Sequence, residues 1–173
     1  MGGHVFGQSS PIRKEHINST LDKFLNELER IFPKYIECRN NLVTLGSVGK
    51  KEISGDIDLG FDEKYLEDIS MWDLEAQRIN ELFVKFKKRA RTSTDYQLMK
   101  RAVITGISEK INELSELIST DLKGSSSGAL YCQFPQYDEN NNKLDINVQI
   151  DINFGNIEWL KFTYYSDSYP GNI

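Results

Sequence analysis

Two segments of the chain repeat apolar residues at the spacing of an amphipathic helix. The first covers residues 21–32, follows helix-capping residues at 18–20 and is closed by Pro33. The second begins near Ser70 or Asp73 and becomes basic towards its end, where cations stabilise the negative end of a helix dipole. The expected core positions are Leu21, Phe24, Leu25, Leu28, Ile31 and Phe32 in the first helix and Trp72, Leu74 or Ala76, Ile79, Leu82, Phe83 and Phe86 in the second.

Other segments have the pattern of β-strands. A short apolar run at residues 42–45 predicts one strand, and an alternating segment predicts another at 56–61. Residues 129–134 and 144–154 predict an antiparallel hairpin around the Asn-rich turn between them. A last strand is expected at 157–165.

The rest of the chain is less definite. Residues 96–106 fit a helix or a strand, and Ser108 followed by Glu109 can open a further helix. Residues 124–128 are Gly- and Ser-rich and predict a loop. The order of elements predicts an α+β fold, with helices packed against one face of a small mixed or antiparallel sheet.

Composition narrows the class of protein. The chain of 173 residues is long enough for one domain, and residues 1–173 are expected to be a single domain or the N-terminal part of a longer protein. No apolar run approaches a membrane helix, and the N-terminus lacks the pattern of a secretory signal, so a cytoplasmic protein without membrane association is expected. Cys38 and Cys132 lack metal-ligand spacing and are expected to be free thiols.

The candidate chemistry begins with Asp56 and Asp58, which stand one residue apart in an alternating segment. On a strand, both carboxylates would lie on one face, and Ile57 and Leu59 on the other. Two like charges held side by side repel, so the pair is explained by a divalent cation, and carboxylate oxygens suit Mg²⁺. The alternative is a pair of ordinary exposed residues, but Asp is depleted in strands.

A third carboxylate can come from the later strand, where residues 147–154 alternate strictly between polar and apolar. Asp151 lies between two isoleucines on the polar side of that pattern. Asp145 shares the same parity and is the rival candidate, although it lies close to the Asn-rich turn.

The segments Leu45-Gly46-Ser47 and Asp56-Ile57-Asp58-Leu59 resemble the signature of the DNA polymerase β-like nucleotidyltransferase superfamily. The N-terminal Gly-Gly-His-Val-Phe and the stretch at 49–58 resemble its small bacteriophage-type members in particular. That signature is an apolar residue, Gly, then Gly or Ser, a spacer, and Asp-apolar-Asp/Glu-apolar. The spacer here, residues 48–55, has only eight residues, which is slightly short. The resemblance implies a palm-like sheet and a third acidic residue flanked by apolar residues on a later strand, which favours Asp151.

The resemblance also implies the reaction. A nucleoside monophosphate would move from an NTP such as ATP to a hydroxyl acceptor, with release of pyrophosphate and with two Mg²⁺ ions, or Mn²⁺ in their place. The implied catalytic and metal-binding residues are Asp56, Asp58 and Asp151. The implied nucleotide-binding residues are Gly46, Ser47, Lys50 and Lys51. For the two lysines, the alternative that they are ordinary solvated surface residues is equally favoured.

The acceptor stays open between the 3′ end of an RNA such as tRNA, a protein side chain and a small molecule such as an aminoglycoside. Residues 85–101 contain seven basic residues and one acidic residue, which favours RNA, with a solvated helix face as the alternative. The net charge of −5 argues against indiscriminate nucleic-acid binding. Other functions compatible with the sequence are an antitoxin-like nucleotidyltransferase that modifies or binds a protein partner, a non-catalytic nucleotide- or RNA-binding domain, and a two-metal phosphodiesterase. A P-loop is disfavoured because Lys51 stands where that motif requires a hydroxyl.

Overall fold

The computed structural model describes residues 9–35, 39–40, 42–46, 49–156 and 160. Within these residues the α-helices are α1 (Lys14–Ile31), α3 (Ala76–Arg89) and α4 (Asp95–Leu114). The strands are β1 (Ile12–Arg13), β2 (Val43–Thr44), β3 (Ile53–Ser54), β4 (Asp56–Asp62), β5 (Ser119–Asp121), β6 (Ala129–Tyr137) and β7 (Lys143–Gly155). Short 3₁₀ helices are η1 (Pro33–Tyr35), η2 (Glu63–Leu66), η3 (Ile69–Trp72) and η4 (Ser125–Ser127).

Five of the strands form one mixed sheet in the order β2-β4-β7-β6-β5. The central pair, β4 and β7, is parallel, and the other neighbouring pairs are antiparallel. β1 and β3 form a separate antiparallel pair. The predicted α+β class and the predicted β6–β7 hairpin are therefore confirmed.

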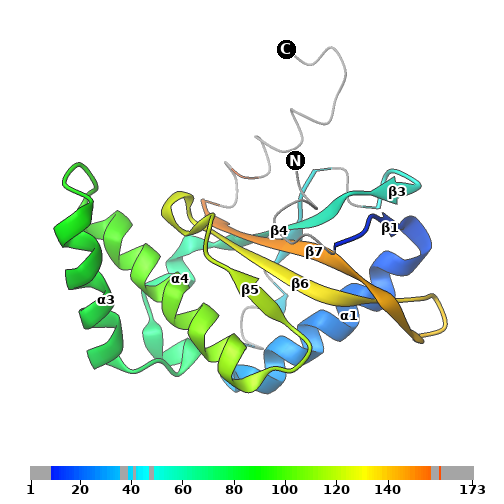
Figure 1. Ribbon diagram of the computed structural model, residues 1–173, viewed down its shortest axis with the longest axis horizontal. Helices are drawn as coiled ribbons and strands as arrows, with labels where there is room; N and C mark the ends of the chain where they lie inside the picture. The colour runs from blue at the N-terminus through cyan, green and yellow to red at the C-terminus, as the bar shows by residue number, and fades with distance from the viewer. Residues whose placement is uncertain (1–8, 36–38, 41, 47–48, 157–159, 161–173) are drawn as a thin grey trace, which may run out of the picture.

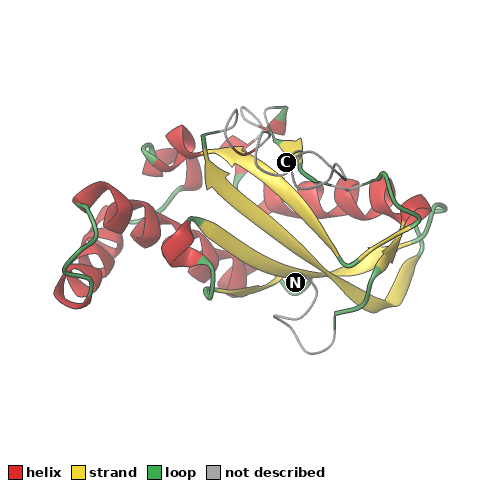
Figure 2. Cartoon of the chain, turned by 90° about the horizontal axis from the view of Figure 1, so that it is seen from above, coloured by secondary structure: helices red, strands yellow, loops and turns green. Residues whose placement is uncertain are grey.

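The helices α1 and α4 lie along one side of the sheet, and α3 packs beside α4 beyond one end of the strands (Figure 1). Figure 2 looks onto the sheet from above, towards the face that these helices do not cover. The helix-facing side of the sheet is apolar: Ile57 and Leu59 of β4 and Ile150 of β7 are fully buried. Phe24 of α1 meets Phe134 of β6 edge to face, with ring centroids 5.4 Å apart. One hydrophobic core thus joins the helices to the sheet.

The ambiguous part of the sequence is a single helix, α4. It begins at a capping box in which the Thr94 hydroxyl accepts from the Gln97 N–H, and the Gln97 side chain accepts from the Thr94 N–H. The expectation that Ser108 opens a separate helix is wrong. Ser108 lies in the last third of α4, where its buried hydroxyl is 2.5 Å from the hydroxyl of Thr120 in β5.

Two further expectations concern element boundaries. The second predicted helix starts later than expected, at Ala76, because Asp73 adopts a left-handed conformation (φ 51°) after η3 and interrupts the helix. The strand expected at 157–165 lies outside the described residues except for Leu160, whose N–H donates to the Asn156 carbonyl at 2.9 Å. None of the helices described is both long and apolar enough to cross a bilayer.

Candidate metal and nucleotide site

The parallel pairing of β4 and β7 brings the three predicted aspartates together. Asp58 of β4 lies directly across from Asp151 of β7, and Asp56 lies across from Gln149. Because neighbouring strands keep side chains of paired residues on the same face, the three carboxylates share one face of the sheet. That face is opposite the one into which Ile57 is buried, so the site lies on the side that α1 and α4 do not cover.

One carboxylate oxygen from each of Asp56, Asp58 and Asp151 lies within 4.8 Å of the others. Asp151 is the most buried of the three, with 6% of its surface exposed, whereas Asp56 and Asp58 are half-buried. Asp145, the rival candidate, is exposed near the other end of β7 and does not belong to this cluster. An acidic triad on the two central strands can therefore hold a metal ion.

Burial disfavours the charged forms of all three carboxyl groups, and repulsion between carboxylates adds to this at Asp58 and Asp151. Burial, followed by the charges of Asp56 and Asp58, raises the pKa of Asp151 to about 8. Burial and then the charge of Asp56 raise the pKa of Asp58 to about 6, and burial raises the pKa of Asp56 as well. Three carboxylates close together gain most from a cation between them, and their hard oxygen ligands fit Mg²⁺ or Mn²⁺.

Three polar residues around the triad were not singled out from the sequence. Gln149, which is 1% exposed, donates from Nε2 to Oδ1 of Asp151 at 2.8 Å. Asn153 donates to the Leu59 carbonyl at 3.1 Å. Its hydrogen bond to Asp58 partly offsets the rise in the pKa of that carboxyl group. Their shared parity with Asp151 along β7 was a visible signal.

Tyr131 is the third of these residues, and only the strand register could have revealed it. It lies across from Asp151 on β6. Burial, and then the negative charge of Asp151, raises the pKa of its phenol. The charges of Asp58 and Asp56 act in the same direction, so the phenol lies within the field of the whole triad.

The residues expected to bind the triphosphate lie in the connection from β2 to β4. The Leu45 N–H donates to the Asp58 carbonyl at 2.8 Å, which brings the start of this connection beside the aspartates. Gly46 follows with φ 64° and Gly49 with φ 77°, a conformation that favours glycine. Lys50 and Lys51 are exposed just after Gly49, and Ser47 lies outside the described residues. Contact between these residues and a triphosphate stays a prediction.

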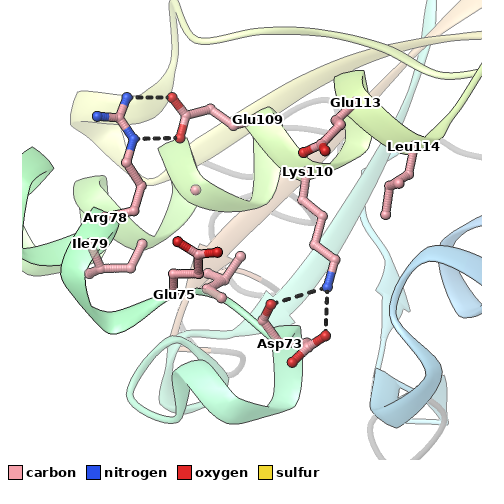
Figure 3. A pocket seen from close by; sticks show the side chains of 10 residues that line it. Asp73, Glu75, Arg78, Ile79, Glu109, Lys110, Glu113 and Leu114 are labelled. Carbon is pink, nitrogen blue, oxygen red and sulfur yellow. Dashed lines mark hydrogen bonds and ion pairs between the residues drawn. The ribbon is translucent and has the colours of Figure 1, made fainter.

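A pocket of about 350 Å³ lies elsewhere, between residues 73–75, which follow η3, and the helices α3 and α4 (Figure 3). Its cations are already paired: Arg78 binds both carboxylate oxygens of Glu109, at 3.1 and 2.6 Å, and Lys110 lies 3.3 Å from the Asp73 carboxylate. None of the three triad aspartates lines it. This pocket and the acidic triad are therefore separate features.

No protein-family model matches the chain, and a search of curated proteins found no relative of significant similarity. Function therefore has to be inferred from the residues and their geometry.

Proposed function

We propose that the protein is a metal-dependent nucleotidyltransferase of the DNA polymerase β-like superfamily, with the five-stranded sheet as its palm-like core. The observation that carries this proposal is the meeting of Asp56, Asp58 and Asp151 on the parallel strands β4 and β7. The turn at Gly46 lies beside β4. It supports transfer from a nucleotide over simple hydrolysis, because its backbone can approach phosphates closely.

The donor set fits Mg²⁺, or Mn²⁺, because it offers three carboxylates whose repulsion a divalent cation relieves. A bound metal ion would neutralise charge on the triphosphate and lower the pKa of the acceptor hydroxyl. The chain itself positions the reactants: the aspartates fix the site on two rigid strands, and Ser47, Lys50 and Lys51 would bind phosphate oxygens. The acceptor is a hydroxyl, for which the basic residues of α3 favour a polynucleotide 3′ end.

A domain that only binds a nucleotide has no use for such a triad. Holding three acidic groups together, partly buried and with raised pKa values, lowers stability without aiding fold or binding. Catalysis by a metal ion gives the arrangement a purpose, in line with the tendency of perturbed carboxyl groups to mark functional sites.

The experiment is transfer of label from each α-³²P-labelled NTP, with Mg²⁺, to a mixture of RNA and protein. Label on one class of macromolecule, absent with Asp56→Ala/Asp58→Ala and present with Asp145→Asn, is expected. The Asp145 control removes a carboxylate from β7, the strand that carries Asp151, without touching the triad. Label that persists in the double variant, or is absent from the wild type with RNA, protein and small-molecule hydroxyl acceptors alike, would contradict the proposal.

A further inference from the structure

The seven basic residues at 85–101 do not form one uniform surface. Three of them are engaged within the protein. Lys87 lies 3.5 Å from the Asp95 carboxylate, and Lys100 binds Glu63 at 2.5 Å. The Arg101 guanidinium stacks over the Phe86 ring, 4.2 Å from its centroid. Each of these three cations has a contact within the protein, although the Nε of Arg101 has no hydrogen-bond partner among the described residues.

The other four, Lys85, Lys88, Arg89 and Arg91, are exposed. Within the described part of the chain none of the four forms an ion pair. Lys85, Lys88 and Arg89 are spaced three and four residues apart on α3, so they project from one side of the helix. Arg91 follows just after the helix ends. These four residues are called the basic face below.

The basic face works against the stability of its own helix. Like charges three or four residues apart repel, and each such pair costs a few tenths of a kcal/mol. Compensation of the helix dipole explains cations in the last turn, which holds Lys88 and Arg89. It does not explain Lys85, which lies outside the last turn, or Arg91, which lies beyond the helix. An anionic partner accounts for all four.

The helix that carries three of the four basic-face residues lies beyond the end of the strand that carries Asp151. In both Figure 1 and Figure 2, α3 and the start of α4 lie beyond the end of the sheet where β7 finishes. Lys100, in the second turn of α4, has its ammonium 3.8 Å from where a Cβ on Gly128 would be. The Gly128 carbonyl in turn accepts from the Phe154 N–H at 2.7 Å, three residues after Asp151.

We propose that the basic face binds the phosphate backbone of a polynucleotide whose 3′-terminal hydroxyl is the acceptor at the aspartate triad. This rests on the proposed function, because it names the acceptor of that same site. Ammonium and guanidinium groups bind phosphate oxygens without reading bases, so the face positions a strand and does not select a sequence. The net charge of −5 does not prevent this, since charges farther than about 8 Å apart are largely screened at physiological salt.

The test is fluorescence anisotropy with short 5′-labelled single strands of RNA and of DNA, identical in sequence, at several salt concentrations. The variant Lys85→Gln/Lys88→Gln/Arg89→Gln/Arg91→Gln removes the face. The control Lys14→Gln/Lys34→Gln/Lys123→Gln/Lys143→Gln removes four equally exposed lysines elsewhere and has the same net charge. The pair variant Lys85→Gln/Lys88→Gln checks for a graded effect.

The face variant is expected to bind both strands about ten-fold or more weakly, with a salt slope smaller by about 3 for four lost phosphate contacts. The control is expected to bind like the wild type, and the pair variant to fall between. No binding by the wild type, or equal losses in the face variant and the control, would overturn the proposal.

Strand binding is measured without NTP or metal, which separates this proposal from the nucleotidyltransferase itself. The variant Asp56→Ala/Asp58→Ala is expected to lose label transfer and to retain strand binding. If the wild type and the face variant transfer label to a protein or small molecule at the same rate, the acceptor is not a polynucleotide. The proposed nucleotidyltransferase activity would then still hold. If the protein binds strands through the basic face but labels no acceptor, the proposed nucleotidyltransferase activity is contradicted, and with it the acceptor role of the bound strand.

Discussion

Gln149 holds the carboxylate of Asp151 by a hydrogen bond from Nε2 to Oδ1, 2.8 Å long. The two residues are next-but-one neighbours on β7, and Gln149 lies across from Asp56 on β4. Both side chains are buried, so water cannot readily replace this hydrogen bond. With one oxygen occupied by the amide, the orientation of the Asp151 carboxylate towards the other two aspartates is fixed.

The variant Gln149→Leu is expected to weaken metal binding by about ten-fold, because residues that orient metal ligands typically contribute ten-fold or more to affinity. The measurement is calorimetric titration with Mn²⁺ in the absence of nucleotide. Gln133→Leu is the matched control: Gln133 lies across from Gln149 on β6 and its amide bonds to Ser9, 3.4 Å away. An equal Mn²⁺ affinity in the wild type and both variants would show that Gln149 does not position Asp151.

The metal-free protein is expected to lose stability as the pH rises from about 4 towards 8. Asp151 has its pKa raised to about 8 and Asp58 to about 6 in the folded state, against about 4 in the unfolded chain. Between those values the folded state binds more protons, so the free energy of unfolding falls with rising pH, by up to about 1.4 kcal/mol per pH unit for each group. Urea unfolding in EDTA at pH 5 and pH 8 measures the difference.

The control for this pH dependence is a pair of single variants on β7. Asp151→Asn is expected to flatten the fall in stability, since the residue with the highest pKa of the three no longer titrates. Asp145→Asn, an exposed position on the same strand, is expected to leave the fall unchanged. A metal-free wild type that is more stable at pH 8 than at pH 5 would contradict the raised pKa values.

Gly128 is expected to tolerate a side chain less well than Gly49. Both have positive φ, 86° and 77°, so alanine at either position costs about 1–2 kcal/mol of backbone strain. A Cβ at Gly128 would also lie 2.9 Å from the Phe154 carbonyl oxygen, whereas nothing lies within 4 Å of one at Gly49. Urea denaturation of Gly128→Ala and Gly49→Ala should therefore show the larger loss for Gly128. Equal losses would mean that the strand end at Phe154 yields without cost.

The positions of the three aspartates along the chain were visible in the sequence, because two strands with strict alternation carried them. Their meeting was not, since β4 and β7 are about 90 residues apart and no local pattern specifies that they pair in parallel with Asp58 across from Asp151. The role of Tyr131 depends on the register of β6 against β7, which explains why the sequence did not point to it. Gln149, in contrast, shares the parity of Asp151 on its own strand, and only its hydrogen bond to Asp151 had to come from the structure.

Helix α4 shows a different limit of sequence reasoning. Ala102 to Ser108 are all buried, so this part of the helix contacts protein on every side. A helix buried all round has no polar face, and the 3.6-residue period on which helix prediction depends disappears. The capping box at Thr94 and Gln97 was the local signal that a helix starts there. Gly106 lies in this buried part of the helix, where a Cβ would be 2.6 Å from the Ile79 side chain of α3.

The most direct test of the central claim, that Asp56, Asp58 and Asp151 form a divalent-cation site, is titration with Mn²⁺ followed by electron paramagnetic resonance. The free-ion signal is expected to be reduced by the wild type and by Asp145→Asn, and to be restored towards that of free Mn²⁺ by Asp58→Asn and Asp151→Asn. Circular dichroism spectra of the four proteins are expected to agree. Mn²⁺ binding that is absent from the wild type, or unchanged in Asp58→Asn and Asp151→Asn, would contradict the site and the function built on it.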